Sequence, residues 1–274
     1  MTSPRGSNLK FFVWSGSVLI ASAASLASLW PASLAAARQQ SASLVQQAAK
    51  VSGGEAAVDY RLAIWLDRNN PSAYLGLAQL KIAAGQPGQA LALLSRAGEG
   101  IAASRLRVRT LIELGRYQEA ATAASSLTIS GASDDDVVLA SLAYALASRP
   151  ADITALISRV TAPEALQRVL RAQAGYVPLA VELYATGLVQ SSSRLLTNLP
   201  TSYERNLLLG RIHFARHTSA DLSQAADFTS SAAALNPSSL EAHQLLAAIY
   251  RAQGNLTAAS EQDTLVVKLQ GGRP

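Results

Sequence analysis

Apolar and polar residues follow each other along most of the chain with the spacing of an amphipathic helix, and the pattern stops at glycines. The clearest examples are residues 74–97, 104–127 and 243–266. In each segment a first helix ends at a glycine, and a small residue follows five positions later inside a second helix. The glycines are Gly85, Gly115 and Gly254, and the small residues are Ala90, Ala120 and Ala259. The pattern therefore predicts pairs of helices joined by tight turns.

The small residues have two different roles in such a pair. Glycine adopts the left-handed conformation that ends a helix, and alanine lets two helices approach closely. Because one pair cannot bury both of its apolar faces, successive pairs are expected to stack. The chain is therefore predicted to be all-α.

The middle of the chain is less regular. No turn glycine is present near Ser148, although apolar residues on both sides keep a helical spacing. Residues 163–173 predict an additional helix, since Pro163 and Glu164 suit a first helical turn. A further helix pair is expected over residues 176–199, with Gly187 at its turn.

Several short stretches carry a family resemblance. They are Gly115-Arg116-Tyr117-Gln118-Glu119-Ala120 at a turn, Leu66-Asp67-Arg68-Asn69-Asn70 and Leu235-Asn236-Pro237 at the ends of units, Leu209-Gly210 in a first helix, and Glu55-Ala56 with Ala63 in a second helix. These stretches resemble the tetratricopeptide repeat family, whose unit of about 34 residues is a helical hairpin. The resemblance implies a right-handed superhelical solenoid over residues 38–270. It implies a fold rather than a partner, because the motif residues of this family are packing residues.

The resemblance also divides the chain. The approximate units are 38–70, 71–100, 101–134, 135–162, 163–200 with the additional helix, 201–239 and 240–270, followed by a tail at 271–274. Residues 1–37 are expected to form a separate segment.

That N-terminal segment has the pattern of a membrane anchor. No residue from Phe11 to Ala37 is charged, and about 20 helical residues cross a hydrocarbon core of about 30 Å. An uncleaved signal anchor would span the membrane from Phe11 to Trp30 and would place the repeats outside the cytoplasm, because Arg5 and Lys10 precede it. A secretory signal cut after Ala37 is the alternative, and an apolar first helix packed within the fold is a third.

Composition and charge narrow the function classes. The chain has 274 residues and no cysteine, which excludes disulfide scaffolds, thiolate metal sites and cysteine nucleophiles. Its 23 Lys and Arg against 18 Asp and Glu give a net charge of +5. The basic residues are scattered and have no aromatic platform beside them, so no nucleic-acid partner is expected.

Candidate catalytic chemistry is sparse. His213 and His217 share a helical face, but no glutamate follows the first histidine, so a structural role is expected and a metal hydrolase is the alternative. The residues from Asp134 to Asp136 lack the alternation of a calcium loop and are predicted to cap a helix N-terminus. Neither a phosphate-binding loop nor a nucleophile elbow is present in the sequence. No enzyme activity, cofactor or metal is therefore expected.

The expected binding residues come from the family resemblance. The first helix of each unit in that family lines a concave groove, and the groove residues implied here are Leu75, Gln79, Ile82, Arg105, Arg109, Tyr184, Arg211, Gln244 and Arg251. Such a groove would suit an extended or helical peptide with carboxylates. The asparagine of the family's carboxylate clamp is missing. The alternatives are a solvated helix face or an Arg109–Glu113 ion pair for the arginines, and packing between repeats for Tyr184 and the aliphatic residues.

These features predict a noncatalytic protein-interaction scaffold or assembly factor at a membrane. A structural subunit of a membrane complex is one alternative. A secreted or periplasmic repeat protein of an envelope machine, released by cleavage at Ala37, is another.

Overall fold

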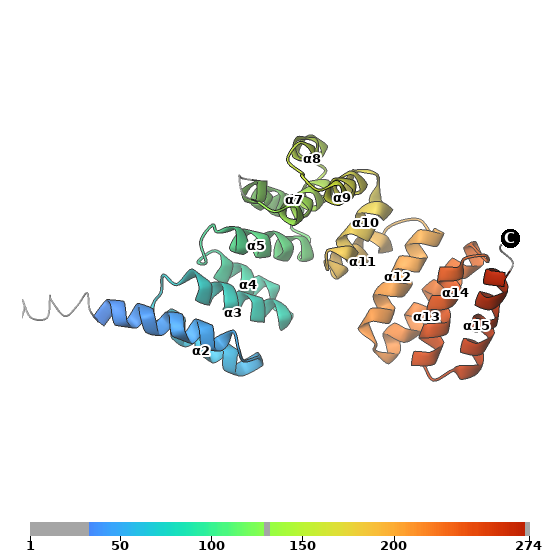
Figure 1. The fold of residues 1–274 in the computed structure, drawn as a ribbon, viewed down its shortest axis with the longest axis horizontal. Coiled ribbons are helices and arrows are strands. Elements are labelled where there is room, and N and C mark those ends of the chain that lie inside the picture. The colour runs from blue at the N-terminus through green and yellow to red at the C-terminus, as the bar shows by residue number, and fades with distance from the viewer. Residues whose placement is uncertain (1–32, 129–131, 272–274) are drawn as a thin grey trace, which may run out of the picture. The chain divides into compact units, whose positions relative to one another are not determined.

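The computed structural model describes residues 33–128 and 132–271, and every regular element in these ranges is helical. Residues 33–48 form a helix that precedes α2. The following helices are α2 (Gly53–Leu66), α3 (Pro71–Ala83), α4 (Pro87–Leu94), α5 (Ile101–Glu113), α6 (Tyr117–Ala124), α7 (Asp134–Leu146), α8 (Pro150–Ile157), α9 (Pro163–Gln173), α10 (Tyr176–Ala185), α11 (Val189–Thr197), α12 (Tyr203–Arg216), α13 (Ser219–Leu235), α14 (Leu240–Ala252) and α15 (Leu256–Gly271), with a 3₁₀ turn, η1 (Ser125–Thr128), after α6. The all-α prediction is confirmed for the described residues, and so is the additional helix, α9 (Figure 1).

The turns after α3, α5, α7, α10 and α14 share one geometry. In the turn after α5, Gly115 has φ +75°, its N–H donates to Ile112 O at 2.9 Å, and the Arg116 N–H donates to Leu111 O at 2.9 Å. The same pair of hydrogen bonds closes α3, α10 and α14, each time at a glycine with positive φ. The turn after α7 has it too, although Ser148 replaces the glycine and adopts φ 57°. The missing glycine near Ser148 therefore does not interrupt the hairpin.

The contacts within the chain define two units, residues 1–103 and 104–274, and each is described by itself. In the first unit α2, α3 and α4 pack one after another. Gly76 of α3 lies against the ring of Tyr60 of α2, so close that a Cβ at this position would be 2.3 Å from Tyr60 Cζ. Ser41 of the helix before α2 donates to Ala63 O at 2.8 Å and accepts from Asn70 Nδ2 at 2.9 Å. These contacts connect three successive helices through side chains that have little room for change.

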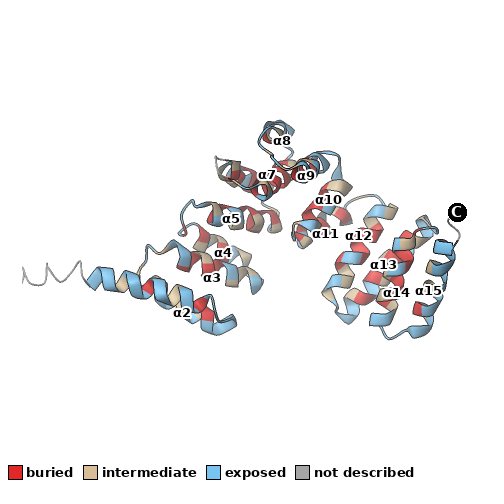
Figure 2. Cartoon of the chain, viewed as in Figure 1, coloured by how far each residue is buried: buried red, intermediate tan, exposed pale blue. Residues whose placement is uncertain are grey.

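In the second unit the hairpins α10–α11, α12–α13 and α14–α15 are made of adjacent helices that contact along their length (Figure 1). Ala120 and Ala259, which the sequence predicts at close helix contacts, are both buried there. Buried residues gather where paired helices face each other, whereas α15 is exposed along most of its length (Figure 2).

Helix α7 lies deepest in this unit. Every residue from Asp136 to Tyr144 is buried, because α6, α8, α9 and α10 all contact it. A helix that is enclosed on all sides is apolar around its whole circumference, as the run from Val137 to Leu139 illustrates. The one charged side chain in the buried stretch, Asp136, therefore needs a partner.

Among residues 33–128 and 132–271, no helix combines the length and the apolar character needed to cross a membrane. The predicted span from Phe11 to Trp30 lies outside the described residues. The alternative cleavage position, Ala37, falls within the helix of residues 33–48.

Candidate functional site

The first helices of successive hairpins in the second unit form a row. Helix α7 contacts α10, α10 contacts α12, and α12 contacts α14. Ion pairs join neighbouring members of the row, since Arg105 of α5 pairs with Asp136 of α7 and Arg211 of α12 pairs with Glu241 of α14. We call this series of helices, α5, α7, α10, α12 and α14, the first-helix row. It contains six of the nine binding residues expected from the sequence, from Arg105 to Arg251.

Arg105 is held by a buried carboxylate. Its Nε and Nη2 donate to the two carboxylate oxygens of Asp136 at 2.6 and 2.8 Å, and the Asp136 side chain is only 1 % exposed. The hydrogen bond from Arg105 is the main reason that the pKa of Asp136 lies below its usual range, and the same bond raises the pKa of Arg105. Because Asp136 stays ionised, Arg105 is fixed in the row and is only partly available to an external anion.

Arg109, one turn further along α5, has a different environment. Burial lowers its pKa, and the nearby charge of Glu113 opposes that effect. The Glu113 carboxylate accepts from the Ser191 N–H at 3.2 Å. The Arg109–Glu113 ion pair, which the sequence left open as an alternative, is not among the ion pairs of the described residues. The guanidinium lies beside Gly187, where a Cβ would be 3.2 Å from Nη2. Arg109 is thus a half-buried cation without a carboxylate partner among the described residues.

The remaining expected binding residues divide between exposed and packed positions. Arg211 and Arg251 are half-exposed but already paired, with Glu241 and Asp263 respectively. Gln244 is exposed on α14, and Tyr184 packs against a core cluster that contains Leu196 and Leu208. In the first unit, Leu75, Gln79 and Ile82 lie on α3, where Gln79 is exposed and Leu75 packs against Tyr74 and Ala103.

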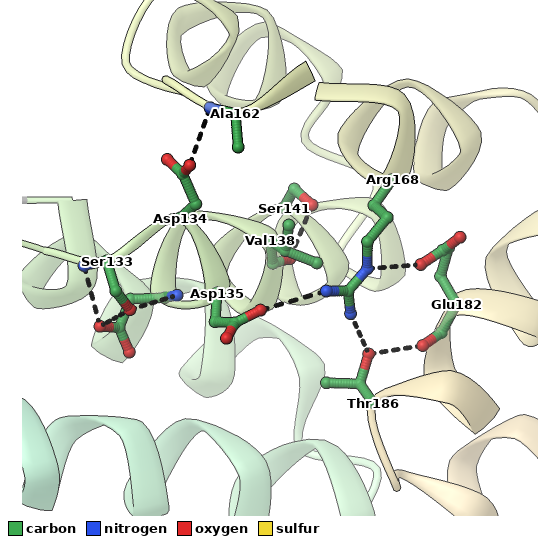
Figure 3. Close-up of polar contacts among 10 residues, drawn as sticks. Ser133, Asp134, Asp135, Val138, Ser141, Ala162, Arg168, Glu182 and Thr186 are labelled. Atoms are coloured by element: carbon green, nitrogen blue, oxygen red, sulfur yellow. Dashed lines mark hydrogen bonds and ion pairs between the residues drawn. The ribbon is translucent and has the colours of Figure 1, made fainter. Parts of the chain in front are cut away.

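The acidic triplet of α7 has three different structural roles (Figure 3). Ser133 caps α7, and Asp136 completes a capping box by accepting from the Ser133 N–H at 3.2 Å. Asp134 accepts from the backbone N–H groups of Thr161 and Ala162, at 3.1 and 2.8 Å, just before α9. These backbone hydrogen bonds lower the pKa of Asp134. The prediction that this triplet caps α7 is therefore confirmed in part: the three residues lie in its first turn, but Ser133 is the cap residue and only Asp136 takes part in the capping box.

The third carboxylate belongs to a charge network that the sequence did not suggest. Arg168 of α9 donates through Nε to Glu182 of α10 at 3.0 Å and through Nη1 to Asp135 at 3.1 Å (Figure 3). Arg171 donates to the other Glu182 oxygen at 2.6 Å. Glu182 is 2 % exposed and is the one charged residue in the otherwise apolar α10. That isolated charge was the signal in the sequence that could have revealed the network.

The two histidines are part of the packing between α12 and α13. His213 Nδ1 lies 3.0 Å from Asp221 Oδ1, and its ring stacks on Phe228 with 5.5 Å between ring centroids. His217 ends α12 in a left-handed conformation. In the described ranges no cluster of His, Asp and Glu has the arrangement of a metal site.

A pocket of about 500 Å³ is lined by residues of α7, α8, α9 and α10, but its lining does not suggest catalysis. Apart from Arg149 and Tyr176, the lining consists of aliphatic, proline, glycine and small polar residues. Arg149 pairs with Asp152 at 2.7 Å. The pocket therefore has no pair of groups that could exchange a proton.

Comparison with known proteins gives a likeness of fold. No protein-family model and no curated protein matches the chain. Among solved structures, MamA (41-end) from Desulfovibrio magneticus RS-1 is 17% identical with a TM-score of 0.33, and the match covers 75% of this chain and 97% of that one. A tetratricopeptide repeat protein from Parabacteroides merdae is 14% identical with a TM-score of 0.41, covering 84% and 93%. Yeast Tom70 is 15% identical with a TM-score of 0.40, covering 85% and 50%. Because these identities and TM-scores are low, the function has to be argued from the contacts within this chain.

Proposed function

We propose that the chain is a noncatalytic protein-interaction scaffold that holds partner polypeptides along the first-helix row and is tethered to a membrane by residues Phe11 to Trp30. The observation that supports binding is the unbroken contact from α7 through α10 and α12 to α14. Adjacent first helices present one extended surface, and extended surfaces of stacked hairpins suit long peptide ligands.

The polar side chains of this surface are already held in place. Asp136 orients Arg105, and Glu241 orients Arg211, so a partner would not have to immobilise them again. Such preorganisation lowers the entropic cost of binding. Each guanidinium keeps donors beyond those used in its ion pair, which can bind carbonyl oxygens of a partner backbone.

The environment of Arg109 favours a partner that carries an acidic group. It is half-buried, has no carboxylate partner among the described residues and lies beside Gly187, where the absence of a side chain leaves access. A carboxylate of the partner at this point would compensate a cation that the chain itself leaves unpaired. The paired arginines elsewhere in the row would contribute mainly hydrogen bonds.

Site-specific photocrosslinking tests the binding surface. A benzophenone amino acid in place of Gln244, which is exposed on α14, is expected to form partner adducts in membranes of the source cell. The matched position is Gln224, which is also exposed but lies on α13, the second helix of its hairpin. Adducts from Gln244 alone support the scaffold. Equal adducts from both positions would favour a subunit enclosed on all sides by a membrane complex, and adducts from neither would contradict the proposal.

Membrane tethering is tested separately by alkaline carbonate extraction. The full chain is expected to stay in the membrane pellet, whereas a chain that begins at Arg38 is expected to be released, because the apolar span has been removed. The mass of the purified protein is the control. A released protein whose mass begins at Arg38 would favour the secreted or periplasmic alternative, and a released protein with Met1 intact would exclude the anchor.

A further inference from the structure

A second surface lies in the first unit, away from the expected groove residues. Helices α2, α3 and α4 line a pocket of about 510 Å³. Its apolar lining includes Ile64, Tyr74 and Leu93, one from each helix. A pocket with apolar walls at a surface is suited to a single bulky side chain of a partner.

The charged groups of this pocket are all cations. Arg61 lies on α2, Lys81 lies on α3 and Arg96 lies in the turn just after α4, and no carboxylate is among the lining residues. Lys81 donates to Gln86 at 2.9 Å, whereas the side chains of Arg61 and Arg96 have no hydrogen bond or ion pair within the described part of the chain. This arrangement contrasts with the first-helix row, where Arg105, Arg211 and Arg251 are paired and, among the expected arginines, Arg109 has no carboxylate partner in the described chain. The pocket therefore has uncompensated positive charge around an apolar centre.

The pocket uses a different face of α3 from the one predicted to bind. Tyr74, Leu77 and Lys81 line the pocket and recur at helical spacing on one side of α3. Leu75, Gln79 and Ile82 recur on another side of the same helix and are not among the lining residues. The two surfaces are thus separate even within one helix.

An exposed apolar stripe extends along α2 beside the pocket. It consists of Val58, Leu62 and Trp65, which are one turn apart, and Trp65 is 74 % exposed. These residues lie opposite the side of α2 that is buried through Ala56, Tyr60 and Ala63. A helix with large apolar residues on its outward face commonly marks an interface.

The charges that flank the stripe indicate what covers it. Arg61 lies on the pocket side of α2, and Asp59 lies on the opposite side. An anionic lipid surface would attract the first and repel the second, whereas a peptide can place its carboxylates on the pocket side alone. We propose that the pocket and the stripe bind an acidic amphipathic segment of a partner protein. One apolar side chain of that segment enters the pocket, its carboxylates pair with Arg61, Lys81 and Arg96, and its remaining apolar face covers Trp65.

Fluorescence anisotropy with the full chain in neutral detergent tests this surface. The probe is a short labelled peptide with leucines on one helical face and glutamates on the other. The double variant R61E/R96E is expected to weaken its binding at least about tenfold, and W65A at least about fivefold. Neither change removes a side-chain hydrogen bond or ion pair within the described chain, and thermal unfolding followed by circular dichroism checks that each variant remains folded.

The matched control is R38E/R68E, which makes the same change in net charge at exposed positions outside the pocket, and which is expected to alter binding less than about twofold. Equal binding by R61E/R96E and the unchanged protein would overturn the proposal. So would equal binding of a peptide in which glutamine replaces every glutamate. Cosedimentation with phosphatidylserine vesicles tests lipid as the alternative ligand. If the unchanged protein binds the vesicles but not the peptide, and R61E/R96E no longer binds the vesicles, the surface binds lipid instead.

Discussion

Replacing Gly210 with alanine is expected to lower the free energy of unfolding by about 2 kcal/mol, although alanine is the better helix former. A Cβ at this position of α12 would lie 2.2 Å from Thr229 Oγ1 of α13 and 3.5 Å from Ala225 O. Thr229 is fully buried, and its hydroxyl donates to Ala225 O at 2.7 Å, so the side chain cannot turn away without losing that bond. Urea denaturation followed by circular dichroism measures the change.

A second substitution identifies the cause. In the double variant G210A/T229A the oxygen that meets the new methyl group is gone, so most of the lost stability is expected to return, with a coupling of about 1 to 2 kcal/mol between the two sites. G88A is the control, because a Cβ on Gly88 of α4 would have no neighbour within 4 Å, and its stability is expected to stay the same or rise by up to about 1 kcal/mol. If G210A is as stable as the unchanged protein, α12 and α13 are not packed as described.

Removing the Glu182 carboxylate is expected to have the largest effect, a loss of about 3 kcal/mol for E182A. The substitution removes a carboxylate that is only 2 % exposed and takes from Arg168 and Arg171 the partner that they share. Because Arg168 also connects to Asp135 of α7, the loss affects the junction of three helices, α7, α9 and α10 (Figure 3). Chemical denaturation of the full chain gives the value.

The same arginine supplies the control. D135N removes the other carboxylate that binds Arg168, but Asp135 is 85 % exposed, so the cost is expected to be no more than about 1 kcal/mol. If E182A and D135N lower the free energy of unfolding equally, burial does not determine how much each ion pair of Arg168 stabilises the protein. If E182A is as stable as the unchanged protein, the ion pairs of Glu182 do not stabilise the junction of α7, α9 and α10.

The turns could be predicted well, since their chemistry is local. Gly115 and Gly187 were recognised because a left-handed residue at the end of a helix is specified within a few positions of sequence. Ser148 shows the limit of that reasoning. It adopts the same conformation without being glycine, because α7 is enclosed on all sides and its neighbours hold the turn in place.

The binding residues could be assigned to helices but not to partners. Arg105 was expected to face an acidic peptide, and the structure pairs it with Asp136, 31 residues away in sequence. The pocket of Arg61, Lys81 and Arg96 was not expected at all, because these residues come from two helices and the turn after a third and share no motif. Neither arrangement has a local pattern, so each becomes visible only when the helices are packed.

The sequence by itself determined that the chain forms helix pairs, which glycine turns are left-handed and which small residues let helices touch, because propensity, capping and period act over a few residues. Only the tertiary structure decided which charges are paired and which are left uncompensated. An ion pair depends on the distance between side chains that stacking brings together, and burial sets how strongly each charge needs a partner. That difference separates Arg105, which is paired within the chain, from Arg61 and Arg96, which have no partner in the described chain.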